Sequence, residues 1–503
     1  MAPPTVTLKI PNGKEVTINT GLFINNEWVS AKNDEKFASI NPATEEEICR
    51  ISKASAEDVD RAVSAAKAAY ENGPWRDVDG TQRGRLLLKL ADLVEADHEI
   101  IASLEALDTG KTFSKAMKDI HEVFEVFRYY GGWADKHYGQ TIETAKNKFT
   151  YTIREPIGVT GAITPWNYPL IMVSLKLGPA LACGNTCILK PSEFSPLSAL
   201  YLANLFVKAG FPPGVVNIVN GDGREAGAAL SEHPDVAKIS FTGSTATGKL
   251  IMKAGSATMK RVSLETGGKS PVIVFDDADI PNALKWVYYG IYANQGQICT
   301  STARIYIHEK IYDDFVKRFV AYTKKHAIVG DQFKEETFVG PLISKAQFDR
   351  VLNYVQIAKD EGATLISGGG VFADRPGGKG YFVQPTLFGD AKPEMRISKE
   401  EIFGPFGVFF KFSNTDEVIK IANNTKYGLS SAVFTKDVVR AIRVSQRLQS
   451  GMVWINSSNN SDYRVPFGGI KESGIGRECG ESALEENSIL KTIYLNLEMT
   501  NDE

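Results

Sequence analysis

The spacing of apolar residues changes along the chain and predicts different structures for its parts. In the first third, apolar positions recur every three or four residues, as in residues 86–107, and this period is typical of amphipathic helices. Residues 55–58 form a potential capping box in front of another such run. The sequence therefore predicts a helical N-terminal third.

From Val159 onward, short apolar runs alternate with helical periods. The expected elements, in chain order, are a strand at 186–190, a helix that starts at Ser195 and Pro196 and stops at Gly210, a strand at 215–219, a strand at 239–241, a helix at 245–254 and a strand at 262–265. Strand–helix–strand units place their strands parallel in one sheet. We therefore expect an α/β fold with a doubly wound sheet, whose crevice suits a nucleotide.

A second alternation follows the pair Gly267-Gly268 and predicts a second α/β domain. Its expected helices lie near 311–326, 346–361, 416–423 and 437–448. Two further segments, 149–153 and 490–497, fit neither region because apolar and polar residues alternate in them, as in half-exposed strands. We expect these two segments to pair as an accessory sheet.

Composition and charge restrict the possible partners. With 57 Lys and Arg against 60 Asp and Glu, the net charge is -3, so no basic excess favours nucleic acid. The longest apolar region, 158–189, is interrupted by Asn167, Lys176 and Pro179, so it predicts no membrane span. Neither end of the sequence carries a recognisable targeting signal, and the cytoplasm is therefore the expected location.

The five cysteines are too few and too scattered for a disulfide framework in a chain of this length. Cys183 and Cys187 have no neighbouring His or Cys to complete a zinc site, so no metal is expected. Cys299 lies in the polar, glycine-containing stretch 294–301. Such a cysteine is commonly a small buried hydrophobe, and a nucleophile is the alternative where a base lies near. Glu265, at the end of an expected strand, is a candidate base.

A glycine-containing turn at 241–248, Phe-Thr-Gly-Ser-Thr-Ala-Thr-Gly, stands where an expected strand gives way to a helix. The free N–H groups at such a junction suit a pyrophosphate, although the turn itself also needs glycine. The sequence contains neither a Gly-x-Gly-x-x-Gly nor a Walker A motif. This turn alone therefore leaves both interpretations open.

Two signatures together resemble those of the aldehyde dehydrogenase superfamily: Glu-Thr-Gly-Gly-Lys-Ser-Pro at 265–271 and Gln-Gly-Gln-Ile-Cys at 295–299. Other segments that look like family motifs, in the family's order, lie at 41–44, 165–169, 190–193, 241–244, 401–405 and 466–469. Because these motifs extend almost from end to end, the whole chain resembles an NAD-dependent, non-acylating aldehyde dehydrogenase.

The resemblance implies a fold, an activity and an assembly. It implies an NAD-binding domain at 1–134 and 157–267, a catalytic domain at 268–480, and a bridging sheet at 135–156 and 481–503. The implied reaction oxidises an aldehyde to a carboxylic acid through a cysteine thiohemiacetal, hydride transfer to NAD and thioester hydrolysis. The bridging sheet implies a homodimer or homotetramer.

The resemblance also implies catalytic roles for residues at matching positions. Cys299 would attack the aldehyde as a thiolate, while Asn167 Nδ2 and the backbone N–H of Cys299 stabilise the developing oxyanion. Glu265 would accept a proton and later activate the hydrolytic water. Lys176 and Glu478 match positions that form a proton path from this base, although a structural ion pair is the other interpretation.

A larger set of residues is implied to hold the cofactor. They are Ile163, Thr164, Pro165, Trp166, Lys190, Glu193, Gly223, Gly227, Phe241, Gly243, Ser244, Glu401 and Phe403. Glu193 favours NAD over NADP because a carboxylate accepts hydrogen bonds from ribose hydroxyls and repels a 2′-phosphate.

The expected substrate pocket departs from that of the broad aliphatic aldehyde enzymes. The loop at 457–462 is polar, which disfavours long alkyl substrates. Asp119 and Glu122 resemble the acidic pair with which the aminoaldehyde and betaine aldehyde branch receives a cationic substrate, although a solvated helix face is the alternative. The other residues assigned to the pocket are Tyr168, Met172, Ser461 and Phe467.

Ile489 stands where many relatives carry a carboxylate that binds arginines. Arg261 and Arg477 are therefore expected to find other partners, such as Glu485 or Glu486. Two further hypotheses remain: a non-catalytic structural protein on this scaffold, and an acylating, CoA-dependent enzyme. The first is expected to lose catalytic residues and the second lacks the glutamate base, whereas Cys299, Glu265 and Asn167 are all present.

Overall fold

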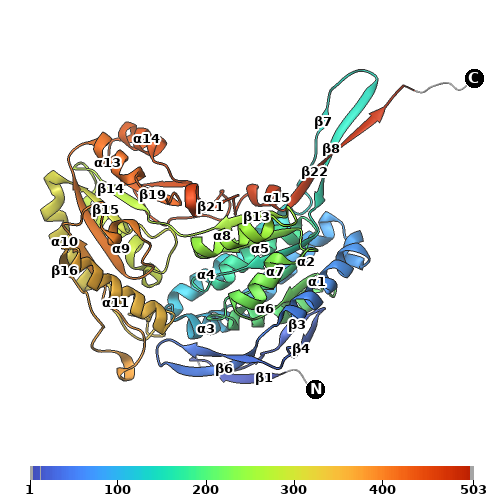
Figure 1. The fold of residues 1–503 in the computed structure, drawn as a ribbon, viewed down its shortest axis with the longest axis horizontal. Helices are drawn as coiled ribbons and strands as arrows, with labels where there is room; N and C mark the ends of the chain where they lie inside the picture. Colours follow the sequence, from blue (N-terminus) through green and yellow to red (C-terminus); the bar gives the residue numbers. More distant parts are fainter. Residues whose placement is uncertain (1–3, 12, 499–503) are drawn as a thin grey trace, which may run out of the picture.

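The computed structural model describes residues 4–11 and 13–498. Two α/β layers, one blue to green and one yellow to red, lie side by side, and a narrow arm of strands extends away from them (Figure 1). Each layer is built on a mostly parallel sheet, as the alternation of strands and helices predicts. The α/β class is confirmed.

The first layer is built on an eight-stranded sheet. Its strands, in spatial order, are β21 (Gly474–Ile475), β13 (Arg261–Glu265), β12 (Lys238–Thr242), β9 (Val159–Ile163), β10 (Thr186–Lys190), β11 (Val216–Ile218), β3 (Leu22–Ile24) and β4 (Glu27–Val29). The five strands from β13 to β11 are parallel, and the outer strands are antiparallel. The strand β21 comes from the C-terminal part of the chain and completes one edge.

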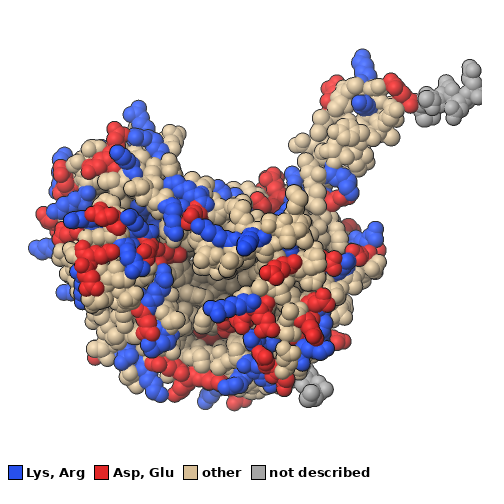
Figure 2. Space-filling model, in the orientation of Figure 1, with Lys and Arg blue, Asp and Glu red and all other residues tan. Residues whose placement is uncertain are grey.

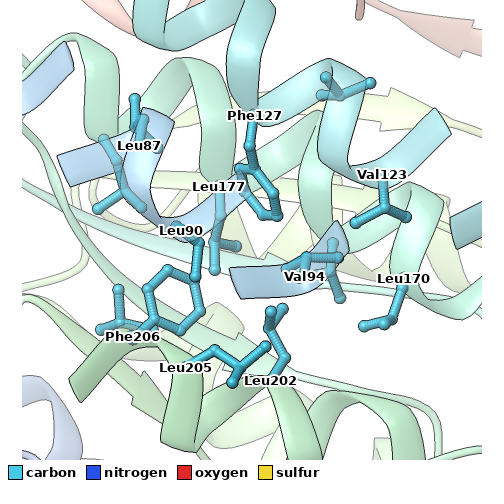
Figure 3. Close-up of a cluster of buried hydrophobic side chains, with 14 of the residues drawn as sticks. Leu87, Leu90, Val94, Val123, Phe127, Leu170, Leu177, Leu202, Leu205 and Phe206 are labelled. Carbon is cyan, nitrogen blue, oxygen red and sulfur yellow. The ribbon is translucent and has the colours of Figure 1, made fainter. Parts of the chain in front are cut away.

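Helices cover both faces of this sheet. They are α1 (Ala56–Glu71), α2 (Gly80–Ala96), α3 (His98–Thr109), α4 (Phe113–Trp133), α5 (Pro169–Ala182), α6 (Leu197–Ala209), α7 (Ala228–Glu232) and α8 (Thr245–Gly255). Figure 3 shows apolar side chains of α2, α4, α5 and α6 packed together, among them Leu90, Phe127, Leu177 and Phe206. These side chains are fully buried, and each contributes about 1.5–3 kcal/mol of transfer free energy. This packing fixes α5, which follows directly on Asn167.

The second layer is built on a seven-stranded sheet. Its strands, in spatial order, are β16 (Thr364–Ser367), β17 (Thr386–Gly389), β18 (Phe406–Phe412), β15 (Arg304–His308), β14 (Pro271–Val274), β19 (Ser430–Phe434) and β20 (Met452–Ile455), all parallel except β16. Its helices are α9 (Ile280–Tyr292), α10 (Tyr312–His326), α11 (Lys345–Asp360), α12 (Arg396–Lys399), α13 (Thr415–Asn423) and α14 (Val438–Arg447). The four helices expected here are therefore confirmed to within a residue or two.

The arm consists of β7 (Thr141–Ile142), β8 (Lys148–Pro156) and β22 (Ser488–Asn496), and α15 (Ser482–Glu486) precedes its last strand. The antiparallel pairing of β8 with β22 places Phe149 opposite Leu495, so the predicted accessory sheet is confirmed. Several of its apolar side chains are exposed, including Tyr494 at 71%. On the face seen in Figure 2, the arm carries few charged residues between its base and its tip.

The prediction of a helical N-terminal third is wrong for the first fifty residues. Two hairpins, β1 (Thr5–Lys9) with β2 (Glu15–Asn19) and β5 (Lys36–Asn41) with β6 (Glu46–Ser52), precede the helices. In β2, buried Val16 and Ile18 alternate with exposed neighbours, which is the period of a strand. The predicted capping box at Ser55 and Asp58 is confirmed and begins α1.

Two smaller differences concern helix boundaries. The run 86–107 is divided at Asp97 between α2 and α3, because the chain changes direction there without losing the apolar period. The helix α6 begins at Leu197, and Pro196 rather than Ser195 is its N-cap. No helix within the described ranges is long and apolar enough to cross a membrane.

Candidate active site

A cavity of about 320 Å³ lies where the two layers meet. Asn167 follows β9, Glu265 ends β13, and Cys299 lies between α9 and β15, and all three side chains line this cavity. The carboxyl ends of parallel strands are the usual binding edge of an α/β sheet. The fold therefore brings together the three predicted catalytic residues, although Asn167 and Cys299 are 132 positions apart in the sequence.

Cys299 is half-buried on the wall of this cavity. Burial, together with the carboxylates of Glu401 and Glu265, raises the pKa of its thiol to about 12. A thiol with this pKa keeps its proton at neutral pH. Attack by the sulfur therefore needs a group that accepts the proton.

Glu265 is the carboxylate that faces the same cavity. Its side chain is 5% exposed, and among the described residues neither carboxylate oxygen has a hydrogen-bond partner. Burial raises the pKa of Glu265 well above its usual value, and the nearby carboxylate of Glu478 raises it further. This arrangement is suited to a base that takes and returns a proton.

Two glycines allow the segment after Glu265 to pack closely against Cys299 and Glu401. A Cβ atom on Gly268 would lie 2.4 Å from the carbonyl oxygen of Cys299. A Cβ atom on Gly267 would lie 2.2 Å from Oε2 of Glu401. The two glycines after Glu265 are thus required by the close packing of the cavity wall.

Asn167 is buried and supplies an amide beside the cysteine loop. Its Nδ2 donates to the carbonyl oxygen of Gln297 at 2.9 Å. Since the amide nitrogen carries two hydrogens, this bond uses one of them and leaves one for another acceptor. Because Asn167 also lines the cavity, its position fits an oxyanion donor.

The residues of the predicted proton path lie behind Glu265. Lys176 Nζ forms an ion pair with Glu478 and donates to Oγ1 of Thr242 at 2.7 Å. Ser240, which no motif in the sequence singles out, also donates to Glu478 at 3.5 Å. Thr242 lines the cavity, so this polar chain leads from the cavity wall into the first layer.

A groove of about 1180 Å³ lies near the carboxyl ends of β9 and β10. Its lining includes Ile163, Glu193, Gly223 and Gly227. Its volume is slightly above the range of about 300–1,000 Å³ that is typical of small-molecule sites. The N-terminus of α8, capped by Ser244, directs backbone N–H groups and a positive dipole end towards the region between the groove and the cavity. These features fit a dinucleotide.

Other predicted cofactor residues are divided between the two spaces. Six line the catalytic cavity: Pro165, Trp166, Gly243, Ser244, Glu401 and Phe403. Thr164, Lys190 and Phe241 are buried beside these spaces rather than in their linings. Thr164 Oγ1 lacks a hydrogen-bond partner among the described residues, which leaves it able to bind a ligand oxygen.

Lys190 is held at the edge of the groove. Its Nζ donates to the carbonyl oxygens of Pro191, at 2.9 Å, and Gly221, at 2.6 Å, and lies 3.6 Å from Glu193. Burial lowers the pKa of Lys190, and the charge of Glu193 opposes this shift. Lys190 and Glu193 therefore place both charge signs at the edge of the groove.

Glu401 and Phe403 belong to a loop that two residues of α11 hold. Gln347 Nε2 donates to the carbonyl oxygen of Phe403 at 2.7 Å, and Arg350 donates to that of Glu401 at 2.6 Å. Phe403 has a left-handed backbone with φ 65°, and its ring meets Trp166 edge to face at 5.2 Å. Both Gln347 and Arg350 line the cavity. The sequence analysis did not identify them, because nothing in the sequence shows that they contact the motif at 401–405.

The two predicted acidic pocket residues are not equivalent. Asp119 is 1% exposed and forms ion pairs with Lys111 at 2.7 Å and Lys115 at 2.8 Å. Burial alone would raise the pKa of Asp119, but the two lysines outweigh burial and lower it. Asp119 is absent from the cavity lining, so it is not presented to a substrate there.

Glu122, one turn further along α4, is half-buried. Burial raises the pKa of Glu122 to about 7, with contributions from Asp119 and Asp462, while Lys115 opposes the shift. Tyr168 and Met172 line the cavity as predicted. Ser461 and Phe467 are absent from that lining: Ser461 is exposed and Phe467 packs against the core of the first layer.

The polar loop 457–462 uses some of its polar groups internally. Ser458 Oγ is 3.1 Å from Oγ1 of Thr302, and Asn459 accepts a hydrogen bond from Thr300. These two residues therefore anchor the loop to the segment after Cys299, and their polar groups are not unpaired towards a substrate. The expectation that the entire loop makes the entrance polar is too simple.

Among the described residues, Arg261 and Arg477 form no ion pair with Glu485 or Glu486 and instead donate to backbone carbonyls. Arg261 donates to the carbonyl oxygen of Ser488 at 2.8 Å, and Arg477 donates to that of Gly469 at 2.9 Å. Backbone carbonyls thus take the place of the predicted glutamates. Ser488 is the first residue of β22, directly after the turn at Asn487, and its carbonyl lies within reach of Arg261.

Comparisons with known proteins agree over nearly the whole chain. The model of the Aldehyde dehydrogenase family matches residues 28–493. An aldehyde dehydrogenase of Alternaria alternata is 50% identical over 98% of each chain, and aldehyde dehydrogenase 1A1 of Homo sapiens is 50% identical over 96% of each chain. The solved NAD⁺ complex of aldehyde dehydrogenase from Bacillus cereus is 46% identical, with a TM-score of 0.93 over 95% of this chain and 97% of that chain.

Proposed function

Because the chain belongs to the aldehyde dehydrogenase family and oxidises aldehydes with NAD as its cofactor, we propose that Cys299 is its nucleophile, Asn167 its oxyanion donor and Glu265 its general base. The observation that carries this assignment is the cavity that these three side chains share. It unites a thiol that keeps its proton with a buried carboxylate that lacks a partner among the described residues.

The first step forms a bond between the Cys299 sulfur and the aldehyde carbon. The thiol proton passes to Glu265, and the aldehyde oxygen takes up negative charge as a thiohemiacetal oxyanion. The second N–H of the Asn167 amide and the backbone N–H of Cys299 stabilise that oxygen. The groove and cavity residues would hold NAD, which would supply the acceptor for the hydride that leaves this carbon, and the acyl group would remain on Cys299 as a thioester.

The second step hydrolyses this thioester. Glu265 takes a proton from a water molecule, whose oxygen attacks the thioester carbon, and the sulfur leaves as the carboxylic acid forms. Before it takes this proton, Glu265 passes the thiol proton of the first step towards Lys176 and Glu478, which form the polar chain behind it. The proton taken from water then returns to the sulfur of Cys299. Each turnover therefore returns Cys299 and Glu265 to their starting states.

Replacement of Cys299 by Ala tests the assignment. Turnover of NAD with a simple aldehyde such as acetaldehyde is expected to be abolished, while NAD still binds with nearly the wild-type Kd, because the groove is unchanged. Cys183→Ala is the matched control, since Cys183 lies outside the cavity lining and its loss leaves the nucleophile intact. Turnover above about a tenth of the wild-type rate in Cys299→Ala would contradict the assignment, given the rate losses typical of a removed nucleophile.

Glu193 leads us to prefer NAD over NADP as the working cofactor. Its carboxylate lines the groove beside Lys190, where it can accept hydrogen bonds from two ribose hydroxyls. A 2′-phosphate at the same position would be repelled. Ile163, Gly223 and Gly227 complete the side of the groove to which we assign the adenosine half.

The proposed domains follow the two sheets and the arm. Residues 1–134 and 157–267 are assigned to NAD binding, 268–480 to catalysis, and 135–156 and 481–503 to assembly, with 1–3, 12 and 499–503 outside the described residues. The exposed apolar side chains of β8 and β22 support a homodimer or homotetramer in which the arm is covered. The cytoplasm remains the location we propose.

A further inference from the structure

The backbone directly before Cys299 makes a left-handed turn. Asn294, Gln295 and Gly296 have φ values of 48°, 57° and 69° in succession. Two of these residues carry a Cβ atom, which makes this region unfavourable, although asparagine tolerates it better than most residues. All three are buried, so interactions with neighbouring segments must hold the turn.

The two amide side chains of the turn supply these interactions. Gln295 Nε2 donates to the carbonyl oxygen of Gly110 at 2.8 Å. Asn294 Nδ2 donates to the carbonyl oxygen of Asn167 at 3.0 Å and to that of Gln297 at 3.3 Å. The side chain of Asn294 therefore contacts the backbone of Asn167, the residue that we propose as the oxyanion donor.

Asn167 in turn donates a hydrogen bond to the turn that contains Asn294. Its Nδ2 donates to the carbonyl oxygen of Gln297 at 2.9 Å, which is the same oxygen that Asn294 reaches. The two asparagines thus form a reciprocal clamp between the loop after β9, in the first layer, and the loop after α9, in the second. Within this clamp, both the backbone and the side chain of Asn167 are fixed relative to Cys299, only two residues beyond Gln297.

We propose that Asn294 is a positioning residue, which directs the second N–H of the Asn167 amide towards the substrate oxygen through this clamp. The inference rests on the proposed function of Asn167 and Cys299. Asn294 is absent from the cavity lining, so it acts on the reaction through Asn167. An oxyanion donor is effective only when it is already aligned with the oxygen before charge develops.

Asn294→Gly tests this role, because glycine adopts the left-handed backbone freely and removes only the amide. The kcat is expected to fall about tenfold, which is less than the roughly 10²–10³-fold loss typical of removing an oxyanion donor itself. The Kd for NAD is expected to stay within about twofold, because the amide lies outside the groove. Gln295→Gly is the matched control: it removes an amide from the same turn that contacts Gly110 instead, and its kcat is expected to stay within about twofold.

A double-mutant cycle separates positioning from general support of the fold. In an Asn167→Ala background, Asn294→Gly is expected to change kcat less than about twofold, because the group that it aligns is gone. An undiminished tenfold loss in that background, or an equal loss in Gln295→Gly, would overturn the proposal. If Asn294→Gly does not fold, Asn294→Asp, which tolerates the same backbone but carries no N–H donor, is put through the same cycle.

The outcome for Cys299→Ala is independent of this cycle. If Cys299→Ala retains turnover, the proposed function itself fails. If Cys299→Ala is inactive and Asn167→Ala is impaired, while Asn294→Gly matches the wild-type kcat, only the positioning role fails.

Discussion

Two buried carboxylates beside the same cavity behave in opposite ways. Asp119 on α4 is 1% exposed and Glu265 at the end of β13 is 5% exposed, so burial does not distinguish them. Asp119 forms ion pairs with Lys111 and Lys115, whereas Glu265 has no hydrogen-bond partner among the described residues. The pKa of Asp119 is accordingly lowered, and that of Glu265 is raised.

The comparison shows that pairing decides what a buried carboxylate can do. Lys111 also binds Glu105 at 2.9 Å, and Glu105 accepts a hydrogen bond from the backbone N–H of Leu170 at 3.2 Å. The Asp119 cluster therefore supports the start of α5, and its two lysines favour the charged form of Asp119. Glu265 keeps no permanent partner, so its proton remains available for transfer.

Glu265→Gln tests the catalytic role of the unpaired carboxylate and has the largest expected effect. The kcat for NAD-dependent aldehyde oxidation is expected to fall about 10²–10⁴-fold, as is typical for loss of a general base. The amide has nearly the same shape and no buried charge, so the free energy of unfolding is expected to stay equal or rise. Steady-state kinetics and denaturant unfolding measure both effects. A kcat above about a tenth of the wild-type value would remove Glu265 from the proposed mechanism.

Asp119→Asn breaks the comparison on its structural side. Lys111 and Lys115 would then lack one carboxylate in a buried site, and loss of one partner of a buried ion pair typically costs about 3–5 kcal/mol. The free energy of unfolding is expected to fall by an amount in this range, as measured in urea. Glu265→Gln serves as the matched control. If both variants are equally stable, pairing does not distinguish the two carboxylates.

The elements that the sequence predicted best are those with a local cause. All five residues of β10 are buried, and a short run of apolar residues between turn signals predicts such a strand directly. The pairing of β8 with β22 also follows from alternation within each segment. The strands before residue 53 were missed because apolar residues on short, half-covered hairpins give only weak patterns.

The site residues that the sequence predicted come from motifs, whereas their partners come from the tertiary fold. Cys299 and Glu265 could be selected by resemblance, but the ion pair between Lys111 and Asp119 joins a loop to a helix. The contact of Asn294 with Asn167 spans 127 positions. No periodicity within either segment reports such contacts. The sequence therefore left Asp119 open between a substrate-facing pair and a solvated helix face, and did not predict its buried ion pairs with two lysines.

The pH dependence of stability sharpens the comparison, because the two carboxylates act with opposite signs. The folded pKa of Asp119 is lowered from 3.8, so its stabilisation is present above pH 3.8 and is lost as pH falls through the folded pKa. The folded pKa of Glu265 is raised from 4.5, so the protonated folded form is favoured, and stability is lost as pH rises from 4.5 to the folded pKa.

Unfolding of wild type, Asp119→Asn and Glu265→Gln across pH tests these signs. The stability advantage of wild type over Asp119→Asn is expected to shrink on acidification below pH 3.8. Relative to Glu265→Gln, wild type is expected to lose stability as the pH rises above 4.5. A shift of one pKa unit corresponds to about 1.4 kcal/mol of unfolding free energy. If the stability difference from wild type changed with pH in the same direction for both variants, the two carboxylates would not lie in opposite environments.

The smallest expected effect concerns charge at the substrate entrance, where Glu122 follows Asp119 by one turn. The positive charges of Lys111 and Lys115 balance those of Glu105 and Asp119, so the cluster leaves little net field for a cationic substrate. Glu122 itself has a pKa of about 7 and is only partly ionised at neutral pH. We therefore expect Glu122→Gln to change the ratio of kcat/KM for 4-aminobutanal over butanal less than about threefold, well under the tenfold that 1.4 kcal/mol of charge attraction would give. A selective tenfold loss with the amine that diminishes at high salt would instead show that Glu122 alone, without Asp119, attracts a cationic aldehyde.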